Sequence, residues 1–125
     1  MTKKIAINGF GRIGRCVFRA FFENQAKYKD LEIVAINDLA PLETNLYLLK
    51  YDSVHGKFNH DAKIEDGSIV VDGKKIRVCS ERDAHNLPWK ELGVDIVLEC
   101  TGLFLEREKA MPHIEAGAKK VMMSG

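Results

Sequence analysis

The chain has 125 residues, of which 46% are hydrophobic and 30% charged, and its formal net charge is +1. This length suits a single domain, and the composition is that of an ordinary globular protein. The small net charge does not indicate a nucleic-acid partner, and no apolar run approaches the roughly 18 residues of a membrane span. The first four residues lead directly into an apolar run, which leaves no room for a signal peptide. We therefore expect no nucleic-acid and no membrane partner.

The cysteines and histidines do not form a recognisable site. Cys16, Cys79 and Cys100 are an odd number at wide spacing, which does not indicate a disulfide framework or a zinc site. Each lies in an apolar run, where a thiol packs as a small hydrophobic group. We therefore expect no catalytic residue among them, no metal site, and a cytoplasmic location. Surface or capping roles are expected for the scattered histidines, which are His55, His60, His85 and His113.

The strongest signal lies near the N-terminus, where residues 3–8 predict a buried strand and residues 12–28 a helix with apolar residues at helical spacing. Between them Gly9, Gly11 and Gly14 follow the G-x-G-x-x-G spacing of a dinucleotide-binding turn. The first glycine would allow the tight turn, the second would let a pyrophosphate approach the backbone, and the third would let the helix pack on the sheet. The helix start would offer N–H groups to the diphosphate. The alternative is a glycine-rich turn without a ligand.

A second apolar strand, predicted at residues 31–36, ends in Asn37 and Asp38. Asp38 follows Gly14 by 24 positions, close to the spacing of about 20 at which a dinucleotide site places an acidic residue. Its carboxylate could accept hydrogen bonds from both hydroxyls of the adenosine ribose and would repel a 2′-phosphate. The sequence therefore favours NAD over NADP as the cofactor. The alternative for Asp38 is a turn residue or a helix N-cap.

The region around residues 58–80 has a different character. It contains two Asp-Gly pairs that separate short strand-like runs, and this pattern is a strong hairpin signal. We therefore expect an antiparallel insertion in an otherwise alternating β/α pattern. The three runs are residues 62–65, 68–71 and 75–79.

The remaining segments complete the alternating pattern. Together they predict one domain over residues 1–125, an α/β fold with a doubly wound, Rossmann-type parallel sheet. No closing helix follows the last strand, so we expect the fold to be truncated. The predicted segments are a helix opened by Pro41 and Glu43 and continuing through Leu49, a polar loop at 51–56, a charged connector at 81–92 with Pro88 and Trp89, a strand at 94–100, a helix at 106–116 that Pro112 should kink or split and Gly117 should end, and a strand at 121–123.

Ligands of an open α/β sheet bind at the carboxyl ends of its strands. Arg12, at a helix start, could reach the diphosphate or could be a solvated side chain. Arg82 could lie over the adenine as a planar cation, or could form an ion pair with its neighbours in the chain. The residues expected at this edge are those of the glycine turn, Asn37, Asp38, residues 81–83, Thr101, Gly102 and Ser124.

Several stretches resemble the NAD-binding half of glyceraldehyde-3-phosphate dehydrogenases. They are KIAINGFGRIGR at 4–15, VAINDL at 34–39, YLLKYDSVHGKF at 47–58, the triplet at 81–83, ECTGLF at 99–104 and EAGAKKVMMS at 115–124. The resemblance implies that Arg12 and Ile13 bind the pyrophosphate, Asp38 and its neighbour Asn37 the ribose, and Arg82 the adenine side, while Thr101 and Gly102 line the cofactor and Ser124 lies toward the nicotinamide.

The same resemblance implies an enzyme larger than this chain. A nucleophilic cysteine, its activating histidine and the catalytic domain would lie beyond these residues, so the chain holds the cofactor without catalytic residues of its own. The implied partners are NAD, a phosphorylated aldehyde and inorganic phosphate, in a cytoplasmic homotetramer of glycolysis. Erythrose-4-phosphate dehydrogenase is a close alternative, because its substrate contacts would also lie outside the chain. A free-standing, non-catalytic nucleotide-binding or interaction module is an alternative of another class.

Overall fold

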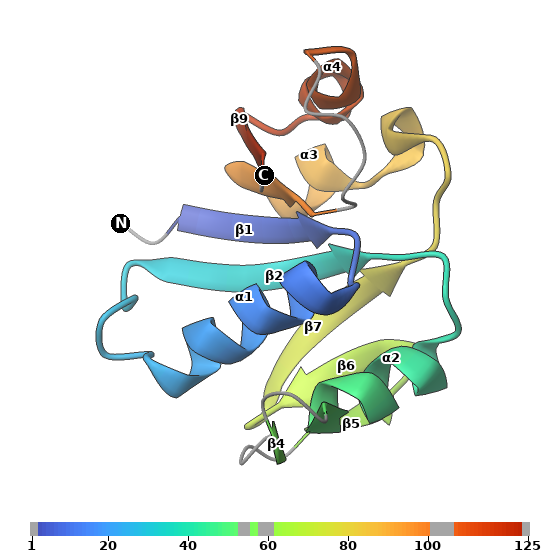
Figure 1. Ribbon diagram of the computed structural model, residues 1–125. Helices are drawn as coiled ribbons and strands as arrows, with labels where there is room; N and C mark the ends of the chain where they lie inside the picture. Colours follow the sequence, from blue (N-terminus) through green and yellow to red (C-terminus); the bar gives the residue numbers. More distant parts are fainter. Residues whose placement is uncertain (1–2, 53–55, 58–61, 101–106, 124–125) are drawn as a thin grey trace.

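The computed structural model describes residues 3–52, 56–57, 62–100 and 107–123 (Figure 1). Over these residues its centre is a seven-stranded sheet in the order β5-β6-β7-β2-β1-β8-β9, and a separate ladder pairs β3 with β4. The strands are β1 Lys3–Asn8, β2 Leu31–Asn37, β3 Tyr51–Asp52, β4 Gly56–Lys57, β5 Ala62–Glu65, β6 Ser68–Val71, β7 Lys74–Cys79, β8 Ile96–Glu99 and β9 Lys120–Met123.

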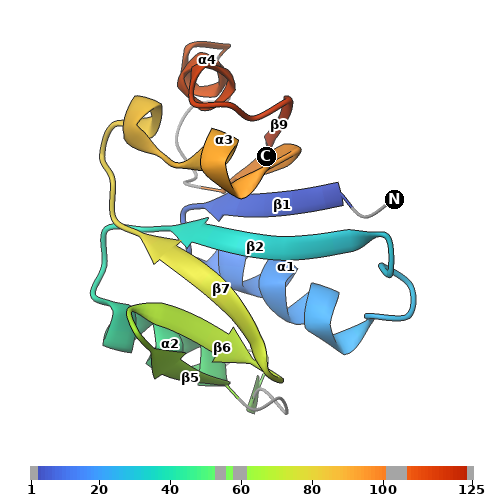
Figure 2. The ribbon, with the colours of Figure 1, turned by 180° about the vertical axis from the view of Figure 1, so that it is seen from behind.

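Helices lie on both faces of the sheet. Helices α1 (Arg12–Glu23) and α2 (Leu42–Lys50) are on one face, and α3 (Trp89–Leu92) is on the other with α4 (Arg107–Glu115) beside it (Figures 1 and 2). Each face has its own apolar core. One core includes Ile7, Phe18 and Ile36, and the other surrounds Trp89 and Val97. The predicted doubly wound α/β architecture is therefore confirmed.

The chain order creates a switch point beside β1. From β1 the chain moves outward through β2 to β7, and then returns to β8 and β9 on the other side of β1, with all five strands parallel. At their carboxyl ends Asn8 is paired with Glu99, and the Cys100 N–H donates to the Asn8 carbonyl at 2.8 Å. Ligands of open α/β sheets bind at such a reversal of strand order. In this sheet the reversal lies at the ends of β1 and β8.

The predicted hairpins are confirmed, but the insertion is not separate from the main sheet. Strands β5, β6 and β7 are antiparallel neighbours. Asp66-Gly67 and Asp72-Gly73 have φ angles between 51° and 83°, as type I′ turns require. The last three residues of β7 also pair in parallel with β2. The third run of the predicted insertion is thus a strand of the parallel sheet as well.

The first helix is shorter than predicted, because α1 ends at Glu23 and not at residue 28. The Asn24 side-chain amide donates to the Ala20 carbonyl at 2.8 Å, and the Tyr28 N–H donates to the Asn24 carbonyl in the following turn. The Tyr28 ring stacks on Phe21, with 6.3 Å between ring centroids. Tyr28 therefore extends the apolar pattern from a turn that packs against the helix.

The segment predicted as a charged connector contains two short helices, the 3-10 turn η1 (Ala84–Asn86) and α3. Trp89 is completely buried, and its carbonyl accepts the Val94 N–H at 2.9 Å. Gly93 ends α3 in the left-handed conformation, with φ of 68°. The neighbouring Lys90 is exposed. The charged composition of residues 81–92 therefore did not indicate that the segment contains a core residue.

Helix α4 continues through Pro112 without a break, so the expected split is not found. The proline lacks an N–H, but its carbonyl still accepts the Ala116 N–H at 3.0 Å. Gly117 follows with φ of 120°, which confirms the predicted end of the helix.

Three predicted site residues, Thr101, Gly102 and Ser124, lie outside the described residues. The loop at 51–56 is described only at its two ends, which pair as β3 and β4 and are therefore strand. In the described part of the chain, no helix has the length and hydropathy that a membrane crossing requires.

Candidate functional site

The glycine turn after β1 has the predicted geometry. Gly9 has φ of 94°, a conformation that glycine adopts at little cost, and its N–H donates to the Asn37 carbonyl at 2.8 Å. A Cβ on Gly14 would lie 2.2 Å from the Gly9 carbonyl oxygen, so α1 crosses the turn in close contact. A Cβ on Gly11 would meet no atom within 4 Å. The space beside the Gly11 backbone is therefore open to a ligand.

The first turn of α1 is also open. Gly11 is the N-cap residue and provides no side-chain cap, and the first turn contains no acidic residue. Arg12 is exposed, and Ile13 is 44% exposed. The first N–H groups of a helix have no partner within the helix and bear the positive end of its dipole. This end of α1 can therefore accept an anion such as a diphosphate.

Asp38 lies beside this turn and is tied to it. Its Oδ1 accepts the Phe10 N–H at 2.9 Å, and its Oδ2 accepts the Ala40 N–H at 3.1 Å and the Asn45 side-chain amide at 3.2 Å. The bond to Ala40, two residues on, makes Asp38 a turn residue, as the alternative prediction supposed. The bond to Phe10 places the carboxylate next to the glycine turn, as the cofactor prediction requires.

Asn37 is 5% exposed, and both polar atoms of its side chain have protein partners. Its Nδ2 donates to Asn8 Oδ1 at 2.7 Å and to the Glu81 carbonyl at 3.0 Å, while its Oδ1 accepts the Glu81 N–H at 2.9 Å. The amide therefore joins the end of β2 to the end of β1 and to the segment after β7.

Arg82 follows Glu81 and is exposed. Within the described residues it forms no ion pair, so the proposed pairing with its sequence neighbours is not found. Asp83 instead contacts His85. Arg82 is therefore available at the edge of the sheet where Asp38 lies.

A buried polar cluster, not predicted from the sequence, lies next to these strand ends. His113 is 1% exposed, so the surface or capping role predicted for it is wrong. Its Nδ1 accepts the Trp89 indole N–H at 3.0 Å, and its Nε2 lies 2.9 Å from Glu99 Oε2, which also accepts the Asn8 side-chain amide at 2.8 Å. The only signal in the sequence was Glu99, an acidic residue inside an apolar strand.

His85 belongs to a second, exposed cluster near the end of α4. Its Nδ1 lies 2.8 Å from Asp83 Oδ1 and its Nε2 lies 2.5 Å from Glu115 Oε2. Hydrogen bonds to Asp83 and then to Glu115 raise the pKa of His85 above its ordinary value. The His85 backbone N–H is the main cause that lowers the pKa of the Asp83 carboxyl. This surface role agrees with the prediction for His85.

We expect His85 to titrate above the ordinary value of about 6.5, and closer to it in the variant Glu115→Gln. The pKa of His85 is higher in the folded protein than in the unfolded chain. The contacts of protonated His85 with Asp83 and Glu115 therefore stabilise the fold fully below the unfolded pKa, and this stabilisation is lost as the pH rises through the folded pKa. The stability difference between wild type and Glu115→Gln should therefore shrink toward alkaline pH. NMR titration of the His85 ring tests this, and a midpoint at or below the ordinary value in the wild type would contradict it.

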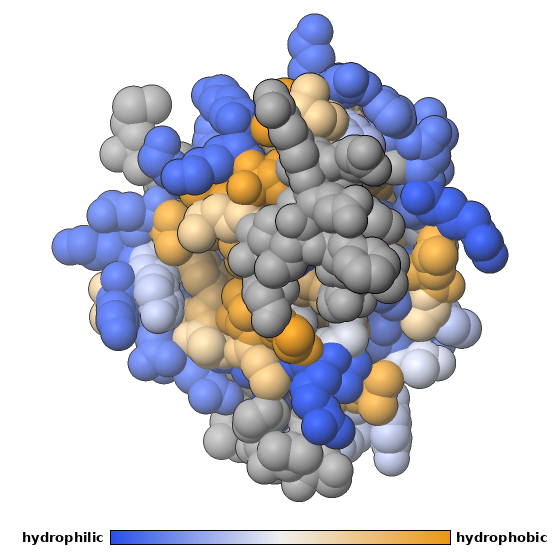
Figure 3. All heavy atoms as spheres, turned by 45° about the horizontal axis from the view of Figure 1, so that its top comes forward, coloured by the Kyte–Doolittle hydropathy of each residue, from blue (hydrophilic) through white to orange (hydrophobic). Residues whose placement is uncertain are grey.

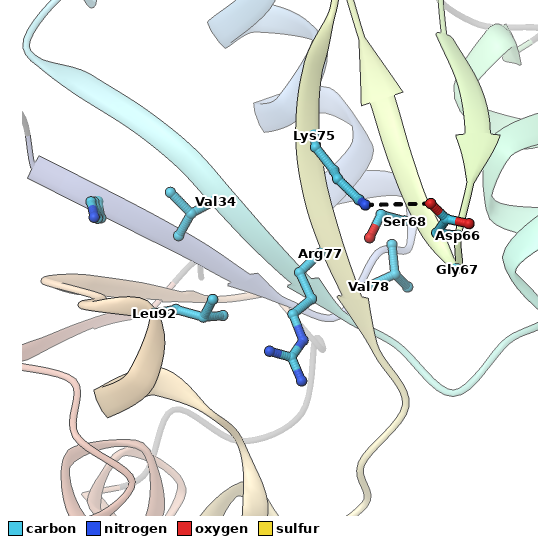
Figure 4. Close-up of a pocket in the computed structure, with 9 residues that line it drawn as sticks. Val34, Asp66, Gly67, Ser68, Lys75, Arg77, Val78 and Leu92 are labelled. Carbon is cyan, nitrogen blue, oxygen red and sulfur yellow. Dashed lines mark ion pairs between the residues drawn. The ribbon is translucent and has the colours of Figure 1, made fainter.

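Two of the cavities lined by the described residues lie away from this edge. One, of about 530 Å³, is on the sheet face that carries α3, and the ion pair of Lys75 with Asp66 stands at its margin (Figure 4). The other, of about 280 Å³, is an apolar groove beside α1. The face in Figure 3 shows hydrophobic residues with hydrophilic ones around them. Neither cavity contains a residue predicted to bind the cofactor. The residues that line the first cavity include Val34, Val78 and Leu92, and those that line the second include Val17, Phe21, Tyr28 and Leu98.

A doubly wound sheet with a glycine turn, an open helix start and an acidic residue after its second strand defines a Rossmann-type dinucleotide-binding domain. Residues 3–107 match the family model described as glyceraldehyde 3-phosphate dehydrogenase, NAD binding domain. The chain belongs to this family, and NAD is the cofactor of the domain.

Curated relatives match the chain over all of its 125 residues. Glyceraldehyde-3-phosphate dehydrogenase of Shimwellia blattae is 59% identical, and the proteins of that family from Escherichia coli strain K12 and Salmonella typhimurium strain LT2 are each 58% identical. The chain spans 37% of the length of each of these relatives. The predicted resemblance is thereby confirmed, and the relatives do not favour the erythrose-4-phosphate alternative.

Proposed function

We propose that the chain is the cofactor-binding part of a phosphorylating glyceraldehyde-3-phosphate dehydrogenase, which oxidises a phosphorylated aldehyde with NAD and inorganic phosphate. One observation supports this most: the open Gly11 backbone, the uncapped start of α1 and the Asp38 carboxylate occur together at one sheet edge. They do so in a chain 58–59% identical, over its whole length, to proteins with that name.

Each residue of the site has a proposed role. The N–H groups at the start of α1, with Arg12 and Ile13, hold the pyrophosphate, and Gly11 lets it approach. Asp38 accepts the ribose hydroxyls and disfavours a 2′-phosphate. Arg82 lies over the adenine. The roles proposed on resemblance alone are those of Thr101 and Gly102 along the cofactor and Ser124 toward the nicotinamide, while Gly9, Gly14 and Asn37 shape the surrounding turns.

The bound nicotinamide supplies a hydride acceptor, and the residues of this chain bind and orient it. We assign no catalytic residue within the chain, since Cys100 is 5% exposed and Cys16 and Cys79 are half-buried. Burial also raises the pKa of the Cys79 thiol, which disfavours the reactive thiolate. The nucleophile would belong to the remaining length of the enzyme, in a cytoplasmic homotetramer.

Calorimetric titration with NAD and NADP tests the cofactor site. We expect saturable NAD binding, and NADP at least about 10-fold weaker, because the Asp38 charge repels the 2′-phosphate. The protein should be expressed at the full length that its gene encodes, with circular dichroism to confirm folding. A folded protein that does not bind NAD would contradict the proposal.

The same preparation tests the reaction. NADH formation with glyceraldehyde 3-phosphate should require inorganic phosphate and should exceed that with erythrose 4-phosphate. The reverse preference would reassign the substrate but leave the cofactor site in place.

A further inference from the structure

The polar side chains behind the cofactor edge form one continuous hydrogen-bonded series. It runs from the Trp89 indole through His113, Glu99 and Asn8 to Asn37. Asn37 then bonds twice to the main chain of Glu81. Its Nδ2 donates to the Glu81 carbonyl, and its Oδ1 accepts the Glu81 N–H. We call these residues the Asn37 network. Its side chains come from α3, α4, β8, β1 and β2, so it joins elements far apart in the sequence.

The directions of the hydrogen bonds that form this series are determined by the ends of the Asn37 network. The Trp89 indole can only donate, so His113 Nδ1 accepts, and the proton is on Nε2, which donates to Glu99. The Glu99 carboxylate accepts from the Asn8 amide, which turns Asn8 Oδ1 toward Asn37. At the other end the Glu81 N–H can only donate, and it meets Asn37 Oδ1. The Asn37 amide therefore has one orientation that satisfies all of its partners.

Members of the network are chain neighbours of residues in the proposed cofactor site. Asn8 precedes Gly9, Asn37 precedes Asp38, and Glu81 precedes Arg82. The Glu81 link is the most direct, because Asn37 holds both the N–H and the carbonyl of Glu81, at 2.9 and 3.0 Å. Arg82 is exposed and has no ion pair within the described residues. The bonds from Asn37 hold the chain directly before Arg82, and the bonds of Asp83 with His85 and Asn86 hold it directly after.

We propose that Asn37 is a positioning residue for cofactor binding, which acts through Arg82. Its buried amide fastens Glu81 to the ends of β1 and β2, and this places Arg82 at the adenine side of the site. The rest of the network fixes the orientation of that amide. This inference rests on the proposed NAD site, and it replaces the contact with the cofactor predicted for the Asn37 side chain.

A double-mutant cycle with Asn37→Ala and Arg82→Ala tests the proposal, with Kd for NAD measured by calorimetry on the intact protein. We expect each single variant to raise Kd about 10-fold, and the double variant also about 10-fold rather than about 100-fold. A purely structural role for Asn37 would weaken binding equally with and without Arg82. Ile69→Ala, a buried change on β6 away from the network, serves as the destabilised control and should leave Kd nearly unchanged.

The Glu81 amide provides a readout that needs no cofactor. Hydrogen exchange at this amide should be faster in Asn37→Ala than in wild type and unchanged in Ile69→Ala. Should Asn37→Ala not fold, Asn37→Ser makes the same test, because its shorter side chain does not reach Glu81. If the wild type binds NAD but the effects of Asn37→Ala and Arg82→Ala on the Kd are additive, the positioning role is overturned and the proposed NAD site is not. A folded wild type that does not bind NAD would overturn the proposed function itself, whatever the exchange result.

Discussion

Replacing Asp38 by alanine is expected to raise the Kd for NAD about 10- to 100-fold, which corresponds to roughly 1.4–2.8 kcal/mol. The carboxylate is proposed to hold the ribose hydroxyls, and a hydrogen bond to a charged group is worth about 1.5–3 kcal/mol. A carboxylate has about four acceptor positions, and donors among the described residues use three of them. One position therefore remains for a hydroxyl, and a second hydroxyl would replace one of the longer bonds at Oδ2. Isothermal calorimetry with wild type in parallel measures the change.

The matched variant for this experiment is Asp38→Asn. It keeps the size of the side chain and one acceptor oxygen but removes the charge, so the preference for NAD over NADP should narrow. Thermal unfolding of both variants shows whether the turn tied by Phe10, Ala40 and Asn45 is retained. An unchanged NAD titration for a folded Asp38→Ala protein would rule out the ribose role and leave Asp38 as a turn residue.

Those parts of the fold that depend on local chain geometry could be predicted from the sequence. An Asp-Gly pair adopts a type I′ turn with few alternatives, so Asp66-Gly67 and Asp72-Gly73 located both hairpins. The glycine turn was predictable for the same reason, because Gly9 needs a positive φ and Gly14 needs the absence of a Cβ. In each case the backbone requirement is met by the residue itself and depends little on distant contacts.

Features created by contacts between distant residues could not be predicted. Trp89 lies in a charged segment and His113 lies 24 positions later, yet they meet in the core through one hydrogen bond. Asn37 was predicted at the cofactor edge beside Asp38, but the sequence did not indicate that its side chain is buried and hydrogen-bonded to Asn8 and Glu81. The sequence shows that a polar residue stands at a strand end. Its partners are determined only when the sheet brings β1, β2 and β8 together.

Alanine variants of Gly14 and Gly11, at the start of α1, are expected to differ in their effects: the first should lower stability and the second should weaken NAD binding. Gly14→Ala should destabilise the fold by about 1–3 kcal/mol, because its Cβ would lie 2.2 Å from the Gly9 carbonyl oxygen and 3.3 Å from Ile7 Cγ2. The nearest of these atoms belongs to the backbone, so relief requires α1 to move away from the turn. Urea unfolding measures the loss, and a stability equal to that of wild type would show that the helix can shift at no cost.

Gly11→Ala is expected to give the opposite result, with stability within about 1 kcal/mol of wild type and NAD binding weakened about 100-fold. Gly11 has φ of −78° and ψ of −158°, which alanine adopts without strain, and the added Cβ meets no protein atom within 4 Å. The methyl group instead enters the space that we assign to the pyrophosphate, and it keeps the diphosphate away from the first N–H groups of α1. Calorimetry and urea unfolding on the same preparation test both halves of the prediction. Normal NAD affinity in Gly11→Ala would mean that the pyrophosphate does not pass beside this glycine, since nothing else in the described protein occupies the space.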